Sequence, residues 1–152
     1  MKYVAFLDIL GFKNRLRELE QNKAKIFISD FSGTIFSIFK SPNLKSGING
    51  YIVSDSLILY SDDTRSTSLY NLIEVIKNIC ESEFIQNGIL MRGAIAKGEF
   101  DRVPAIELPK LEKQLIVGQA YVDAFLLESS VKVLGVNISK DVYDDILSMG
   151  IT

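Results

Sequence analysis

Two spacings of apolar residues recur along the chain, and they predict where strands and helices lie. Short apolar runs bounded by glycine or serine indicate strands, whereas an apolar residue at every third or fourth position indicates a helix. The expected strands are 3–9, 49–54, 56–61, 89–100 and 131–138, and the expected helices are 12–20, 22–39, 66–86, 118–129 and 139 to the end. Residues 101–116, which contain two prolines, are expected to form an irregular excursion or a ragged hairpin.

The order of these elements predicts an α+β fold. It begins β-α-β-β-α-β, a ferredoxin-like core in which an antiparallel sheet carries helices on one face, and it continues with an appended α-β-α segment. In this topology the turn between the second and third strands lies at the same sheet edge as the end of the first strand. Asp8 is near the end of the first strand and Asp55 is in that turn. We therefore expect the two carboxylates to meet.

Length and composition indicate one globular domain over residues 1–152, with 47% hydrophobic and 24% charged residues. The formal net charge of -2 argues against a nucleic-acid polymer as partner, because such a partner favours a basic face. No apolar run approaches the roughly 18 residues that cross a bilayer, and the N-terminus lacks a signal-peptide pattern. A cytoplasmic protein without a membrane partner is expected.

Two residue types limit the chemistry. The single cysteine, Cys80, excludes an internal disulfide and fits a reducing compartment, and its apolar surroundings indicate a buried, inert thiol. The chain has no histidine. This excludes histidine-dependent triads, histidine general bases and histidine zinc sites, and leaves carboxylates, lysine, arginine and tyrosine as candidate functional groups.

Asp8 and Asp55 are candidate metal ligands for this reason. Carboxylates that meet raise one another's pKa unless a positive charge lies between them, and divalent cations prefer oxygen ligands. Such a pair can hold two Mg²⁺ or Mn²⁺ ions that clamp the attacking and leaving oxygens of a phosphoryl transfer. The helix start in "ILGFKNR" offers free amides to a polyphosphate. In the alternative interpretation, Asp8 caps the following helix and Asp55 is a turn residue.

Four segments form a set that, in this order and spacing, is more specific than any one of them: "FLDILGF", "GYIVSDSLILY", "MRGAIAKGE" and "VGQAYVDAFLLES". Together they resemble the catalytic domain of class III nucleotidyl cyclases, and the resemblance covers residues 3 to about 147. It implies a ferredoxin-like core and a reaction with two metal ions. In that reaction the ribose 3′-hydroxyl of a nucleoside triphosphate attacks the α-phosphorus and pyrophosphate leaves.

The resemblance also implies roles for individual residues. Asp8 and Asp55 would bind the two metal ions, and the carbonyl group of Ile9 would be a further ligand. The backbone from Ile9 through Gly11 to Phe12 would face the triphosphate. These residues thus form the candidate metal and phosphate site.

The positions that would read the base depart from those of purine cyclases. A lysine is usual four residues before the second metal aspartate, and Tyr51 stands there. The second base-reading position holds Leu115. This combination is similar to the pyrimidine cyclases of bacterial anti-phage signalling systems (Pycsar), which make cyclic UMP or cyclic CMP. In the alternative interpretation, Tyr51 is only a strand aromatic.

The later helix departs as well. The family pattern offers an asparagine and, four residues on, an arginine that stabilises the transition state, but Val122 and Leu126 occupy these positions. Arg92 is the first candidate to replace them, with Lys97 and Arg102 behind it. Arg92 is equally well explained as a solvated or salt-bridged arginine at a strand end. Lys97, a candidate for substrate binding, and Arg102 are also explained as surface charges.

Glu128 either orients a neighbouring group or caps a helix end. The resemblance further implies a homodimer with paired sites at the interface, where one subunit supplies the metals and the other reads the base. The family pattern continues with a further strand pair, so the chain is expected to be either a compact member or a fragment.

Three functions remain open. The first is a metal-dependent cyclase that acts on UTP or CTP in bacterial anti-phage defence and signals to a separate cyclic-nucleotide-responsive effector. The second is a catalytically silent cyclase-like domain that binds a nucleotide or a protein partner. The third is another two-metal phosphoryl-transfer fold, such as a diguanylate-cyclase or polymerase-palm relative, although the chain lacks a "GGDEF"-like turn.

Overall fold

The structure is a computed structural model, and it describes residues 1–12, 17–41, 47–103, 115–130 and 135–150. Its elements are β1 (Lys2–Ile9), α2 (Gln21–Lys40), β2 (Ile48–Val53), β3 (Ser56–Ser61), α3 (Ser66–Asn87), β4 (Met91–Gly98), β5 (Asp101–Val103), β6 (Leu115–Val117), α4 (Gln119–Ser130), β7 (Gly135–Ile138) and α5 (Lys140–Met149). Most of the predicted elements are confirmed within one or two residues. The helix expected at 12–20 and the strand expected from 131 lie partly outside the described residues.

The five-stranded sheet has the order β2-β3-β1-β4-β7. The pairs β2/β3, β3/β1 and β1/β4 are antiparallel, which confirms the predicted ferredoxin-like core. The appended strand β7 pairs with β4 in the parallel direction, so the complete sheet is mixed. The central position of β1 explains its almost continuous apolar sequence, because a strand covered on both faces buries successive side chains.

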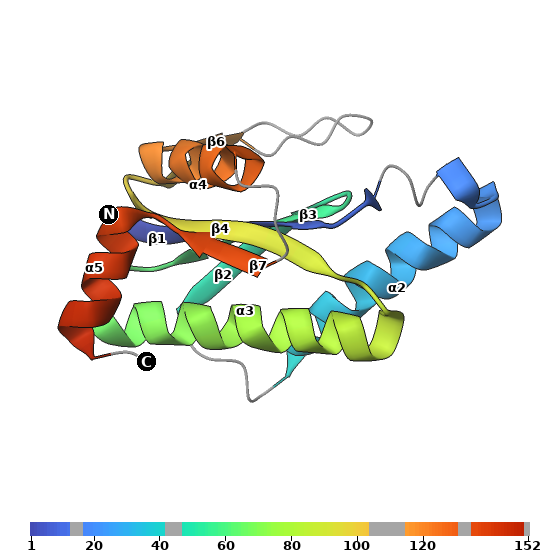
Figure 1. The fold of residues 1–152 in the computed structure, drawn as a ribbon, viewed down its shortest axis with the longest axis horizontal. Helices are drawn as coiled ribbons and strands as arrows, with labels where there is room; N and C mark the ends of the chain where they lie inside the picture. Colours follow the sequence, from blue (N-terminus) through green and yellow to red (C-terminus); the bar gives the residue numbers. More distant parts are fainter. Residues whose placement is uncertain (13–16, 42–46, 104–114, 131–134, 151–152) are drawn as a thin grey trace.

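Helices cover both faces of this sheet (Figure 1). Helices α2, α3 and α5 lie on one face, whereas α4 packs against β1 and β4 on the other. The alternation along β1 follows this division: Ala5 and Leu7 belong to the apolar cluster beneath α3, while Val4 and Phe6 belong to the cluster beneath α4. The predicted placement of helices on one face therefore holds for the core helices, but the appended helix α4 lies on the opposite face.

The excursion between β4 and α4 is a hairpin at its base. Strand β5 pairs antiparallel with β6 and forms a separate two-stranded sheet, while residues 104–114 lie outside the described residues. At the end of the excursion, Gly118 has a φ of +152°, and a Cβ atom there would lie 2.1 Å from the carbonyl oxygen of Glu99. Glycine therefore permits the close approach at which α4 begins.

Among the described residues, none of the helices is both long enough and apolar enough to cross a bilayer.

Candidate functional site

Three strands carry candidate residues to the same end of the sheet. Asp8 of β1 lies opposite Arg92 of β4 and opposite Ser56 of β3 in the two antiparallel registers. The backbone N–H of Ile9 donates a hydrogen bond to the carbonyl oxygen of Asp55 at 3.2 Å. The end of β1 therefore lies beside the β2–β3 turn, as the topology predicts.

A pocket of about 660 Å³ opens at this point, between the end of the sheet and α4. Its lining combines acidic, basic, hydroxyl and aromatic groups: Phe6, Asp8, Ile9, Gly11, Phe12, Asp55, Ser56, Arg92, Phe125, Glu128 and Ser129. The structure thus brings together six predicted site residues, namely both aspartates, Arg92 and the segment that contains Ile9, Gly11 and Phe12. Gly11 adopts a φ of +72°, which favours glycine at this turn after β1.

Arg92 lies between two carboxylates inside the pocket. Its Nε atom donates a hydrogen bond to Oδ1 of Asp8 at 3.1 Å. The same atom lies 2.9 Å from Oε1 of Glu128, which is an ion-pair distance without the alignment of a hydrogen bond. The hydrogen bond that Arg92 donates to Asp8 is the main cause that raises the pKa of Arg92. Arg92 is therefore firmly cationic and held by both acids.

Glu128 is the functional candidate that the sequence left undecided. Only 3% of Glu128 is exposed, and burial is the main cause that raises the pKa of its carboxyl group. The charge of Asp8 raises this pKa further, and Arg92 opposes the rise. Glu128 lies on α4, four residues after the buried Ala124 and eight after the buried Ala120, and this spacing is the sequence signal that it faces the sheet.

The charge balance of the pocket favours cations. Three carboxylates and one guanidinium line it, so full ionisation leaves two excess negative charges. Like charges in one site are stabilised when a positive group enters it. The acids of this pocket can therefore attract a divalent cation as well as Arg92.

The carboxylates of this pocket fit a Mg²⁺ or Mn²⁺ ion that is also coordinated by substrate and water. They fit less well a metal ion whose ligands all come from the protein. Among the residues that the structure describes, no group of three or more Asp, Glu, His or Cys side chains is arranged to hold a metal ion. Magnesium is commonly bound by one or two carboxylates together with substrate phosphates and water. Asp8 and Asp55 both line one pocket and supply two such carboxylates.

Among the residues whose side chains the structure describes, Tyr51 does not line this pocket within the single chain. Tyr51 is buried on β2 and stacks on Tyr60, with ring centroids 5.7 Å apart, in the apolar cluster beneath α4. Leu115 begins β6, where its side chain lies outside the described part of the chain. The same holds for the side chain of Arg102 on β5. The base-reading roles of Tyr51 and Leu115 stay predictions.

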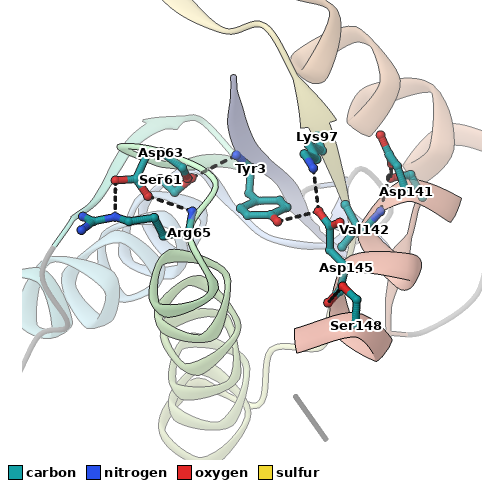
Figure 2. A network of polar contacts seen from close by, with 10 residues as sticks. Tyr3, Ser61, Asp63, Arg65, Lys97, Asp141, Val142, Asp145 and Ser148 are labelled. Atoms are coloured by element: carbon teal, nitrogen blue, oxygen red, sulfur yellow. Dashed lines mark hydrogen bonds and ion pairs between the residues drawn. The ribbon is translucent and has the colours of Figure 1, made fainter. Parts of the chain in front are cut away.

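Lys97 lies elsewhere and has other partners. Its ammonium group is 2.8 Å from Oδ2 of Asp145 on α5, and the hydroxyl group of Tyr3 donates to the same oxygen at 2.6 Å (Figure 2). Burial would raise the pKa of Asp145, but the hydrogen bonds from Lys97 and Tyr3 lower it. Lys97 thus does not line the pocket of Asp8 and Asp55, and its observed contacts join the sheet to α5. Its role in substrate binding stays a prediction.

Val122 and Leu126, which stand where the family pattern has asparagine and arginine, are both exposed on α4. Phe125 lies between them and lines the pocket, with its ring edge-on to Phe6 at a centroid distance of 5.3 Å. The exposed side of α4 thus adjoins the pocket and is apolar.

Comparisons with known proteins add one finding about the fold. No family model and no curated protein matches the sequence. The adenylyl cyclase CyaB from P. aeruginosa is similar in structure, with a TM-score of 0.73 and 18% identity over 97% of this chain and 80% of that chain. A bacterial light-regulated adenylyl cyclase gives a TM-score of 0.69 at 14% identity, over 95% of this chain and 44% of that chain.

An EAL/GGDEF domain protein from M. capsulatus is less similar, with a TM-score of 0.50 at 14% identity over 91% of this chain and 84% of that chain. All three identities are too low to transfer an activity, but the structural agreement extends over nearly the whole chain. The sheet order, the helix on its second face and these matches lead to one conclusion: the chain has the fold of the adenylyl cyclases.

Proposed function

We propose that the protein is a nucleotidyl cyclase that converts a pyrimidine nucleoside triphosphate, UTP or CTP, to its 3′,5′-cyclic monophosphate and pyrophosphate. The product would act as a second messenger in bacterial anti-phage defence. The observation that carries the proposal is the meeting of Asp8, Asp55 and Arg92 in one pocket of a cyclase-like fold. An ordinary turn aspartate and an ordinary helix-capping aspartate would have no reason to share a pocket that has an excess of negative charge.

Each residue has a distinct task in this proposal. Asp8 and Asp55 hold the divalent cations, which supply charge neutralisation and activation of the ribose 3′-hydroxyl when they are bound. Arg92 supplies the cationic side chain for charge that develops on the phosphates. The turn at Ile9, Gly11 and Phe12 faces the triphosphate.

The base would be recognised across a two-fold dimer. In this arrangement Tyr51 and Leu115 of one protomer face the phosphate site of its partner. The phenol ring of Tyr51 is bulkier than the side chain of the lysine that purine cyclases carry at this position. It therefore narrows the space available to the base. A smaller base is therefore favoured.

One observation favours a second candidate function, a catalytically silent cyclase-like domain that binds a nucleotide or protein. Helix α4 presents Val122 and Leu126 where the transition-state residues are expected, and Arg92 is already engaged by Asp8 and Glu128. A domain of this kind would bind nucleotide without turnover.

The two functions are distinguished by product analysis. Purified protein is incubated with Mn²⁺ and each of the four ribonucleoside triphosphates, and the products are resolved by mass spectrometry. Cyclic UMP or cyclic CMP together with pyrophosphate is the expected result. If none of the four nucleotides gives a cyclic product, the silent domain is the better interpretation.

A matched pair of variants connects the product to the pocket. Asp55→Ala should lower turnover by about 100-fold or more, because a metal-binding carboxylate contributes several kcal/mol to transition-state stabilisation. Asp144→Ala is the control, since Asp144 is exposed on α5 and does not line the pocket. Full turnover in Asp55→Ala would exclude the metal-binding role.

A further inference from the structure

A second pocket, of about 530 Å³, lies on the α3 face of the sheet, opposite to the face that α4 covers. Its lining residues come from helix α3, the segment that follows it, strand β4, the edge strand β7 and helix α5. Its lining consists of Ile73, Ile76, Lys77, Cys80, Phe84, Ile89, Leu90, Met91, Ile95, Gly135, Val136, Ile138 and Ile146. Its volume is within the roughly 300–1,000 Å³ that small-molecule sites occupy.

The described lining of this pocket is almost entirely apolar. Among the described residues that line it, Lys77 is the one charged side chain, and the others are apolar. Lys77 is exposed and forms no ion pair with any of the residues that the structure describes. A ligand that complements the pocket is therefore apolar over most of its length and carries a single negative charge at one end.

We propose that this pocket binds a monomeric medium-chain fatty acid, with the hydrocarbon chain among the isoleucines and the carboxylate at Lys77. Nucleotides and other polar metabolites fit poorly, because Lys77 is the one polar side chain among the described lining residues that could replace their water. A hydrocarbon chain loses no hydrogen bonds on entry and gains from each buried methylene group. The proposal is independent of the proposed cyclase function.

The position of the pocket connects it to β4. Met91 and Ile95 line it, while Arg92, between them in the sequence, points to the opposite face and lines the candidate active site. A bound fatty acid would therefore pack against the strand that holds Arg92.

Cys80 provides a direct measurement of occupancy. It lines the pocket, it is the single cysteine of the chain, and it is only partly buried. The protein is treated with N-ethylmaleimide in the absence of nucleotide and metal, and the intact mass is followed at increasing concentrations of dodecanoate below its micelle concentration. Saturable protection is expected, with alkylation slowed at least fivefold. From octanoate to dodecanoate the Kd should fall about three- to fourfold per methylene group.

A charge-matched pair of variants tests the role of Lys77. Lys77→Gln should raise the Kd of dodecanoate about fivefold, as expected for one partly exposed ion pair, and should leave the Kd of dodecanol unchanged. Lys25→Gln is the control, because Lys25 is exposed on α2 and does not line the pocket. Circular dichroism verifies that both variants are folded.

Four results would overturn the proposal. Absence of saturable protection in the wild-type protein excludes fatty-acid binding, and equal Kd values for Lys77→Gln and Lys25→Gln exclude recognition of the carboxylate. Protection that appears without ligand as the protein concentration rises identifies a second copy of the chain as the occupant. Protection by phosphatidylglycerol vesicles but not by dodecanoate identifies a membrane surface. None of these results bears on the cyclase, because the assay contains no nucleotide.

Discussion

Asp8 is an anion within an otherwise apolar central strand, and its neighbours explain how the fold accommodates it. Burial of an unpaired carboxylate is costly, whereas a carboxylate beside a guanidinium is stabilised. Arg92 stands directly opposite Asp8 in the β1/β4 register and donates to it at 3.1 Å. The strand register itself therefore supplies the partner of Asp8.

Glu83 is a second buried acid, and it makes the stability of the protein depend on pH. It is fully buried on α3, and burial is the main cause that raises its pKa from 4.5 to about 7. Hydrogen bonds from Asn87 and Thr34 oppose the rise, and the charge of Asp30 adds to it. Between pH 4.5 and about 7, Glu83 therefore keeps its proton in the folded state but has already released it in the unfolded state.

The expected consequence is a loss of stability as pH rises. Glu83 should contribute fully below pH 4.5, and about 2 to 3 kcal/mol of the free energy of unfolding should be lost between pH 4.5 and 7. Glu83→Gln should remove this part of the pH dependence, whereas Glu81→Gln, at an exposed position, should retain it. Urea unfolding from pH 4.5 to 8 measures the difference. Identical pH profiles for wild type and Glu83→Gln would contradict the assignment.

Tyr51 is the residue on which the proposed choice of base depends. Tyr51→Lys restores the residue that purine cyclases carry at this position and should erode the preference for UTP or CTP over ATP and GTP. Tyr51→Phe keeps the ring that stacks on Tyr60 and is the matched control. Relative kcat/KM for the four nucleotides measures the effect. An unchanged profile in Tyr51→Lys would remove Tyr51 from base recognition.

At the scale of elements, substitution of a glycine by alanine should have opposite effects on stability in β4 and in α2. A Cβ atom at Gly93 would lie 2.4 Å from the carbonyl oxygen of Phe6 and 2.3 Å from Cδ2 of Leu7, so Gly93 permits the close pairing of β4 with β1. A Cβ atom at Gly33, within α2, would meet nothing within 4 Å. The same substitution therefore tests close packing at one position and helix propensity at the other.

Gly93→Ala should lower the free energy of unfolding by about 2 kcal/mol, because a core that is already filled must shift. Gly33→Ala should raise it by about 0.5–1 kcal/mol, because alanine is the better helix former. Denaturant unfolding of both variants at one pH gives the comparison. A neutral effect of Gly93→Ala would mean that β1 and β4 are less closely packed than the structure has them.

The order of elements was predictable because each boundary has a local signal, such as a glycine, a proline or a change of period. From that order follow the core topology and the meeting of Asp8 with Asp55. The face that α4 covers was not predictable in the same way, because its apolar residues do not form one narrow stripe: Ala120 and Ala124 are buried, while Val122 and Leu126 are exposed.

The partners of individual charges were harder to predict than the elements. The pairing of Arg92 with Asp8 follows once the β1/β4 register is known. The register of two strands, however, cannot be read directly from the sequence. Lys97 and Asp145 are far apart in the sequence, and their contact depends on how α5 returns to the sheet. Glu128 reaches Arg92 only because α4 lies over β4.

At the scale of the whole molecule, we expect the proposed dimer to bury the exposed apolar side of α4, which adjoins the pocket. Leu126→Glu should convert the dimer to a monomer, because a charge would be buried at the interface. Leu147→Glu is the matched control, since Leu147 is equally exposed but lies on α5. Sedimentation velocity distinguishes the two variants. A monomeric wild-type protein, or a dimer that persists in Leu126→Glu, would exclude this interface.

The most direct test of the central claim is Mn²⁺ binding measured by electron paramagnetic resonance, with and without UTP or CTP. Because Asp8 and Asp55 supply only part of the coordination, we predict weak binding without nucleotide and strong binding with it. Asp55→Asn should lose the nucleotide-dependent binding, and Asp144→Asn should retain it. Equal Mn²⁺ binding by Asp55→Asn and the wild-type protein would contradict the claim that the two aspartates share a metal and phosphate site.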